Sequence, residues 1–285
     1  RPLALPGNPF AGALIDSTQA LELNTLPSSA VIIGAGAVAL EFASLWNAAG
    51  CEVTLLIRKD RVLSTWERRA SMTLTRELKR RGVNVIARTA VDRVDTGANL
   101  GATVHYRQGD SDEDRTAYGE VVLAAIGRVP NTDADWFRSS GLKLDERGYV
   151  TVDGYGRTNL DGVWALGDIT PGHALAHRAF EQGITIAEKI AGADPKPVID
   201  DTVPQVVFSF PEAASVGLTL DQAKALEDVV EPKETAYPML SNARMLMSGE
   251  GGSMTVVSGA FANNPDMQVV LGVHIVSPIA SDLIA

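Results

Sequence analysis

The fold is decided by one stretch of the chain, Ala30-Val31-Ile32-Ile33-Gly34-Ala35-Gly36-Ala37-Val38-Ala39-Leu40-Glu41. Its first four residues form an apolar run, which is typical of a strand buried in a parallel sheet. A glycine-rich turn over residues 34–39 follows, and residues 40–49 predict a helix that ends before Gly50. A second apolar run, residues 53–57, completes a β-α-β unit.

The spacing of small residues in this turn predicts a dinucleotide site. Gly34 permits the tight turn, Gly36 lets the backbone approach a pyrophosphate, and Ala39 is small enough for close packing of helix on strand. The amino end of the helix adds free N–H groups and the positive end of the helix dipole. A packing turn without a ligand is the alternative, and the position between a strand and a helix favours the dinucleotide.

The end of the second strand bears on which nucleotide is bound. An acidic residue there would bond the ribose 2′-hydroxyl and favour NAD. This chain has Ile57 instead, followed by Arg58, Lys59 and Arg61. Because guanidinium groups pair well with phosphate, we hypothesise that NADPH is accepted. A solvated basic loop is the alternative.

Hydropathy patterns predict further elements on both sides of this unit. Helices are expected near residues 18–23, 67–81, 173–191 and 220–226, the last opened by a capping box from Thr219 to Gln222. A strand at 83–86 extends the parallel sheet, and antiparallel strands at 103–106 and 121–124 bracket the acidic loop 110–114, taken as a solvated turn. Further strands are expected at 150–152, 163–166, 205–210, 254–257 and 268–275.

Composition excludes several classes of function. A net charge of −10 argues against a general nucleic-acid binder, and no apolar run approaches the roughly 20 residues of a membrane span. Cys51 is the only cysteine, so neither a disulfide framework nor dithiol chemistry is possible within one chain, and a cytoplasmic setting is expected.

Other polar and sulfur-containing residues leave alternatives open. Asp168 follows a predicted strand, where its carboxylate could bond a polyol or simply close a Gly-Asp turn. His105 is expected to face solvent and His274 to be structural, while His173 and His177 begin a helix. No histidine pair has metal-ligand spacing, so no metal is predicted. The methionines are interpreted as packing residues: Met239, Met245, Met247 and Met254.

Several segments together resemble the pyridine nucleotide–disulfide oxidoreductase family. They are residues 1–7, 34–41, 125–131, 164–168, 175–179, 210–219 and 272–276. Within that family, residues 175–179 lean towards dihydrolipoamide dehydrogenases. Residues 57–60 look like glutathione reductases, and residues 242–244 and 278–282 look like quinone-reducing members.

The resemblance implies an α/β fold with a Rossmann-like three-layer FAD/NAD(P)-binding domain. Four parts are expected: residues 1–26 end a first FAD-domain segment, 27–146 form the NAD(P)-binding domain, 147–200 form a second FAD-domain segment, and 201–285 form a truncated α+β interface domain for dimerisation. The intact parent would bind FAD and NAD or NADP, and would act as a homodimer.

The resemblance also carries binding roles onto individual residues. The nicotinamide-nucleotide site would comprise Gly34, Ala35, Gly36, Ala37, Val38, Ala39, Leu40, Glu41, Ile57, Arg58, Val91 and Gly127. The FAD site would comprise Asp168, Ala174, Leu175, Ala176 and His177, the last four through their backbone. Glu41 would also pair with a lysine beside the flavin.

The chain departs from the family in three respects. The first glycine fingerprint for FAD, the redox cysteine pair and the catalytic His–Glu pair have no match, and Cys51 is in the wrong place. We therefore expect an inactive internal fragment without catalytic residues. Its parent would oxidise dihydrolipoamide with NAD⁺ through FAD and a redox disulfide. The alternatives are a quinone- or glutathione-type reductase acting on another small disulfide or quinone, and a non-catalytic nucleotide-binding or assembly module.

Overall fold

The chain forms two compact units, which the computed structural model describes over residues 1–97, 101–248 and 251–284. The larger unit comprises residues 2–127 and 206–285, and the smaller one comprises Arg1 and residues 128–205. The larger unit is therefore discontinuous in sequence.

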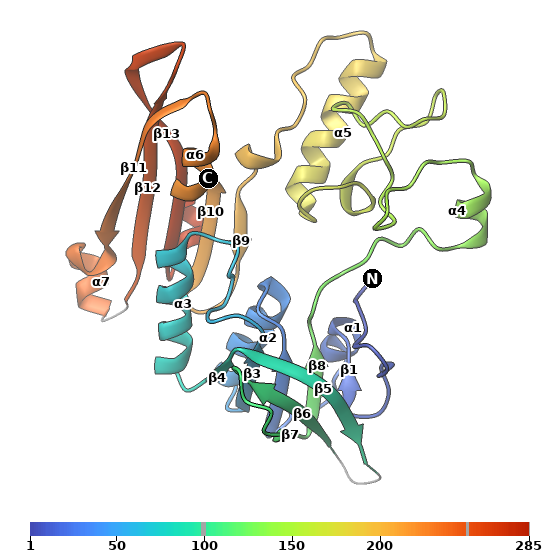
Figure 1. The fold of residues 1–285 in the computed structure, drawn as a ribbon, viewed down its shortest axis with the longest axis vertical. Helices are drawn as coiled ribbons and strands as arrows, with labels where there is room; N and C mark the ends of the chain where they lie inside the picture. Colours follow the sequence, from blue (N-terminus) through green and yellow to red (C-terminus); the bar gives the residue numbers. More distant parts are fainter. Residues whose placement is uncertain (98–100, 249–250, 285) are drawn as a thin grey trace. The chain divides into compact units, whose positions relative to one another are not determined.

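A five-stranded parallel sheet in the order β1-β8-β2-β3-β4 is central to the larger unit (Figure 1). Its strands are β1 (Leu14–Ile15), β2 (Ser29–Ile33), β3 (Glu52–Ile57), β4 (Asn84–Ala87) and β8 (Val121–Ala124). The helices of this region are α1 (Ser17–Leu21), α2 (Ala37–Ala48) and α3 (Arg68–Arg80). The predicted β-α-β unit and the strand after it are confirmed, although α2 begins three residues before the expected position.

Side chains alternate between the two faces of this sheet and build two cores. Ile32, Leu55 and Leu74 belong to a core on the side that α2 and α3 cover. Val31 and Ile33 belong to a second core on the opposite side, together with residues of an antiparallel sheet: β5 (Thr89–Thr96), β6 (Ala102–Gln108) and β7 (Arg115–Gly119). Helices, parallel sheet and antiparallel sheet thus make three layers.

Residues 121–124 form a strand as predicted, but the antiparallel arrangement expected for them is wrong. They pair with β2 in parallel, Ala30 opposite Val121 and Ile33 opposite Ala124. A short apolar run predicts an extended, buried segment but not the strand with which it pairs. The pairing depends on the whole sheet.

The tail of the chain adds a second five-stranded sheet in the order β11-β12-β13-β10-β9. Its strands are β9 (Gln205–Val207), β10 (Glu212–Gly217), β11 (Val229–Pro238), β12 (Ser253–Phe261) and β13 (Asn264–Ser277). Its helices are α6 (Leu220–Ala225), α7 (Ala243–Ser248) and α8 (Ala280–Ile284). The predicted capping box is confirmed, because Thr219 and Gln222 each bond the other's backbone N–H.

The smaller unit is built around α5 (Ala176–Ile190), with the short helix α4 (Asp135–Ser139). The strands predicted at residues 150–152 and 163–166 are wrong: these stretches make only isolated bridges, Leu144 with Val150 and Arg157 with Trp164. An apolar run becomes a strand only where a neighbouring strand extends the ladder. The predicted helix also begins later than expected, because Leu175 is still extended and is the N-cap residue.

Candidate functional site

Gly34 occupies a position that no other residue could fill without a shift. Its φ is +142°, and a Cβ built on it would overlap the carbonyl oxygen of Ala125. Its N–H donates to the Leu56 carbonyl at 3.1 Å. The turn after β2 is therefore held tightly between the ends of β3 and β8.

Gly36 differs from Gly34 in its backbone conformation and in the space around it. It is the N-cap of α2, with φ −92° and ψ −176°, which any residue adopts. It is exposed, and a Cβ added there would meet no atom within 4 Å. Among the described residues, no side chain caps the amino end of α2. The structure thus leaves open space beside the free N–H groups of a twelve-residue helix, as a bound pyrophosphate requires.

The rest of the fingerprint fixes the helix to the sheet. Ala39 and Leu40 are fully buried, and the Ala39 Cβ lies 3.4 Å from the position a Cβ would take on Gly34. Ala35 accepts a hydrogen bond from the Leu63 N–H at 2.9 Å, and Ala37 and Val38 are half-buried beside it. Small residues here permit the close helix–strand contact that the spacing predicts.

Glu41 connects α2 to the tail. Its Oε1 accepts a hydrogen bond from the Phe208 N–H at 3.0 Å. One turn further on, Ser44 Oγ accepts from the Phe210 N–H at 3.1 Å. Sequence reasoning missed these contacts, because backbone donors distant in sequence leave no side-chain signal.

A basic group lies at the carboxyl end of β3. The side chain of Ile57 is buried and its carbonyl accepts from the Thr89 hydroxyl at 3.1 Å, whereas Arg58 is exposed without an ion-pair partner among the described residues. Arg61 is less available, because it pairs with Asp60 at 2.9 Å.

Arg88 is a further basic residue at this edge that sequence reasoning missed. Its N–H donates to the Lys59 carbonyl at 3.0 Å, and its side chain is exposed. The signal was available, since Arg88 directly follows β4 and the carboxyl ends of parallel strands share one edge.

Two further residues assigned to the same site lie outside the fingerprint turn, one in β5 and one in the loop after β8. Val91 is half-buried in β5 and packs on the core opposite α2. Gly127 is exposed, has φ +142° and accepts a hydrogen bond from the Leu3 N–H at 3.0 Å. Their contribution to a nucleotide site stays a prediction.

The residues assigned to FAD lie in the smaller unit. Asp168 is exposed in a 3-10 turn, Gly167–Ile169, and its carboxylate has no partner among the residues described. Ala174 and Leu175 precede α5, and Ala176 and His177 begin it. His177 Nε2 lies 2.7 Å from the Pro204 carbonyl, so its ring is engaged and its backbone remains for a ligand.

Cys51 is unsuited to redox chemistry. Its side chain is buried, and burial raises the pKa of its thiol to about 11, with the charges of Glu120 and Glu52 adding to the effect. A protonated thiol is a poor nucleophile.

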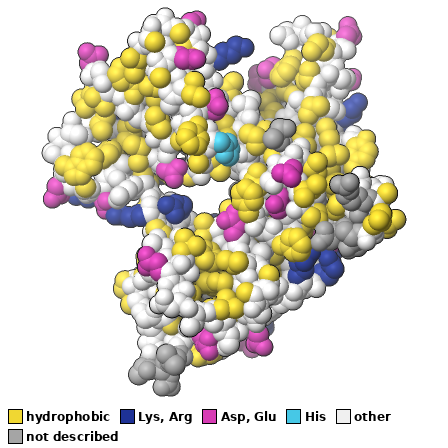
Figure 2. Space-filling view, turned by 180° about the vertical axis from the view of Figure 1, so that it is seen from behind, with side chains coloured by type: hydrophobic (Ala, Val, Ile, Leu, Met, Phe, Trp, Pro, Cys, Tyr) yellow, Lys and Arg dark blue, Asp and Glu magenta, His cyan; other side chains and the backbone are white. Residues whose placement is uncertain are grey.

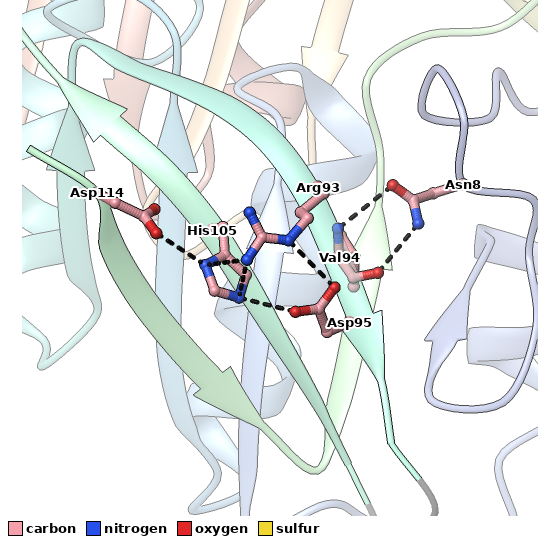
Figure 3. Close-up of polar contacts among 6 residues, drawn as sticks. All are labelled: Asn8, Arg93, Val94, Asp95, His105 and Asp114. Carbon is pink, nitrogen blue, oxygen red and sulfur yellow. Dashed lines mark hydrogen bonds and ion pairs between the residues drawn. The ribbon is translucent and has the colours of Figure 1, made fainter. Parts of the chain in front are cut away.

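His105 lies on the side of β6 opposite the core residues Val104 and Tyr106, as predicted for a solvent-facing residue, and charged side chains surround it (Figure 3). Its side chain is 14% exposed and lies between the carboxylates of Asp95 at 2.9 Å and Asp114 at 3.3 Å. The Arg93 guanidinium lies 3.2 Å from both ring nitrogens. Arg93 and Asp95 come from β5 and Asp114 from the loop before β7, and the pattern of one strand does not show such contacts.

The remaining predictions for histidine and methionine residues have different outcomes. His274 is buried as a structural residue: Nδ1 lies 2.7 Å from Ser215 Oγ and Nε2 3.2 Å from the Leu218 carbonyl. His173 does not begin α5. Met247 is 87% exposed, so the prediction that it packs in a core is wrong.

The described part of the chain lacks two further features, a metal-binding cluster and a membrane-spanning helix. No group of three or more histidine, cysteine, aspartate or glutamate side chains there could hold a metal ion. No helix there is long and apolar enough to cross a membrane. On the face shown in Figure 2, acidic side chains are dispersed among exposed hydrophobic ones and form no single broad patch.

Comparison with known proteins covers almost the whole chain. Residues 1–183 match the pattern described as pyridine nucleotide-disulphide oxidoreductase, and residues 203–285 match the dimerisation domain of the same name. Dihydrolipoyl dehydrogenases of Geobacillus stearothermophilus and Cupriavidus necator are each 36% identical, over 100% and 99% of this chain. The chain spans 58% of the length of both relatives.

Solved structures agree with these matches. The LpdA protein of Mycobacterium tuberculosis is 30% identical to this chain, with a TM-score of 0.84. The matched region covers 99% of this chain and 59% of the LpdA chain. The HOCl-induced flavoprotein disulfide reductase RclA of Escherichia coli is 25% identical with a TM-score of 0.81, covering 97% of this chain and 62% of its own.

Proposed function

The chain belongs to the pyridine nucleotide-disulphide oxidoreductase family, and we propose that it carries the nicotinamide-nucleotide site of a dihydrolipoamide dehydrogenase. The observation that carries this proposal is the open space at Gly36, beside the uncapped amino end of α2. Curated relatives named dihydrolipoyl dehydrogenase support the choice within the family.

The residues present fit the nucleotide. The backbone from Gly34 to Ala39 would hold its pyrophosphate, since Gly36 leaves room and the N–H groups of α2 face that room. When bound, the nicotinamide supplies two-electron transfer as a hydride. The chain's own part is to position the nucleotide and to balance its charge.

The FAD residues fit in part. The Asp168 carboxylate is exposed and could accept hydrogen bonds from a polyol, and the backbone before α5 is accessible. In the whole protein we propose FAD, a redox disulfide, lipoamide as the substrate and a homodimer, supported by the matched dimerisation domain. With one buried cysteine, the 285-residue chain should not turn over lipoamide.

Nucleotide binding to this chain is the decisive test. Titration with NADH, followed by nicotinamide fluorescence, should give saturable binding that Gly36→Ala weakens by at least about tenfold. Gly183→Ala is the matched control, because it also adds a methyl where nothing lies within 4 Å, in α5. Equal affinity in wild type and Gly36→Ala, with both folded, would overturn the assignment.

We also propose that NADPH is accepted. Exposed Arg58 and Lys59, with Arg88 beside them, offer cationic groups where a 2′-phosphate would lie. Arg58→Ala should weaken NADPH binding and leave NADH binding unchanged. If the wild type binds NADH at least about tenfold more tightly than NADPH, this proposal is overturned.

A further inference from the structure

A cavity of the larger unit lies away from the fingerprint, between α3 and the tail sheet. Its volume is about 750 Å³, within the range of small-molecule sites. One wall is the exposed side of α3, and the other comprises the ends of β11 and β12 with the start of α6. Figure 1 shows α3 beside this sheet, which it contacts through β12 and β13.

The α3 wall is strongly basic in an acidic protein. Residues 67–81 carry six basic and two acidic side chains, a net charge of +4 within a chain of net charge −10. Arg68, Arg69 and Arg76 line the cavity. Arg68 has no ion-pair partner among the described residues, and Arg76 is 71% exposed with only a long contact of 3.9 Å to Glu77.

The acidic side chains of the cavity are mostly engaged. Glu67 is buried and accepts hydrogen bonds from the N–H groups of Arg69 and Ala70 at 2.6 and 2.7 Å, so the amino end of α3 balances its charge. Glu234 lies 3.8 Å from the Arg69 guanidinium. Asp221 lies in the first turn of α6, where the helix dipole favours it.

The cavity also has apolar side chains beside the arginines. Met72 and Tyr237 face the cavity from opposite walls, and each is 52% exposed. Met72 lies midway along α3 between Arg68 and Arg76, which are about 12 Å apart along the axis. The floor offers the hydroxyls of Thr73 and Ser253, 3.3 Å apart.

We propose that this cavity binds a small anion with a planar apolar body. Its charged group pairs with the guanidinium of Arg68 or Arg76, and its body lies between Met72 and Tyr237. Because the two walls come from α3 and the tail sheet, the bound molecule holds these parts of the larger unit together. The site is separate from the fingerprint turn and does not depend on the proposed nucleotide function.

The test uses anilinonaphthalene sulfonate, a fluorescent aromatic anion, as the probe. With methyl-labelled methionines observed by NMR, the Met72 signal, assigned by Met72→Leu, should shift as the probe saturates. Exposed Met247 and Met267 lie outside the cavity and should not shift. The double variant Arg68→Ala/Arg76→Ala should weaken binding by at least about tenfold.

Arg147→Ala/Arg157→Ala is the matched control, because it removes the same charge from exposed positions outside the cavity. Its affinity should equal that of the wild type. An unmoved Met72 signal at saturation, or equal affinities in both double variants with native circular dichroism, would overturn the proposal.

Discussion

Replacing Thr255 with valine should stabilise the larger unit. Thr255 is fully buried in β12, opposite Ala236 of β11 and His274 of β13. Its hydroxyl has no hydrogen-bond partner among the described residues. Valine has the same branched shape and suits a strand equally well, so the change removes a buried polar group and little else.

The expected gain follows from the cost of that hydroxyl. A buried, unpaired polar group costs about 1–3 kcal/mol, so Thr255→Val should gain about 1–2 kcal/mol. For a unit of about 200 residues, each kcal/mol shifts the melting temperature by roughly 2–4 °C. Urea unfolding followed by circular dichroism should show a higher midpoint with an unchanged slope.

Thr255→Ser is the control, since it keeps the hydroxyl and removes the methyl group. It should lose about 1 kcal/mol, giving the order valine, threonine, serine. A valine variant less stable than the wild type by more than about 0.5 kcal/mol would refute the reasoning, because the hydroxyl would then have a partner worth keeping.

Three other predictions concern single residues. Burial is the main cause that lowers the pKa of His274, against the raising effects of the Leu218 carbonyl and Glu67. The unfolded chain, with a histidine pKa of about 6.5, then takes up the proton first. The contribution of His274 to the free energy of unfolding should therefore be full above about pH 6.5 and fall as the pH approaches the folded pKa. His274→Gln should flatten this pH dependence when urea midpoints are measured. The same pH dependence in the variant and the wild type would contradict the prediction. Cys51, with a thiol pKa of about 11, should resist a thiol reagent in the native chain and react with it when the chain is unfolded in urea. Rapid labelling of the native chain would contradict the burial of this thiol. Gly34→Ala should lower stability by about 2 kcal/mol or more through strain and overlap with Ala125, and a melting temperature equal to that of the wild type would exclude this geometry.

The sequence predicts best where the signal is local and dense. The β-α-β unit, α3 and the capping box at Thr219 are confirmed, because each depends on residues within one or two turns. The fingerprint turn was also predicted from local spacing, and Gly34 has the positive φ that such a turn requires.

Prediction failed where structure depends on distant partners. The pairing of residues 121–124 and the absence of strands at 150–152 are set by neighbouring segments. The hydrogen bond from Phe208 to Glu41 joins residues separated by 167 positions. Hydropathy of one segment holds no information about such contacts.

Because residues 128–205 interrupt the larger unit in sequence, a cut in the backbone there should have little effect on the core of that unit. The entropy lost on closing a loop rises only with the logarithm of its length, so a long insertion costs little more than a shorter one. Hydrogen bonds from Phe208 and Phe210 to α2 join the two stretches of chain without using the insertion. A protease cut within the insertion should therefore leave residues 2–127 and 206–285 associated, as two polypeptides that share one core.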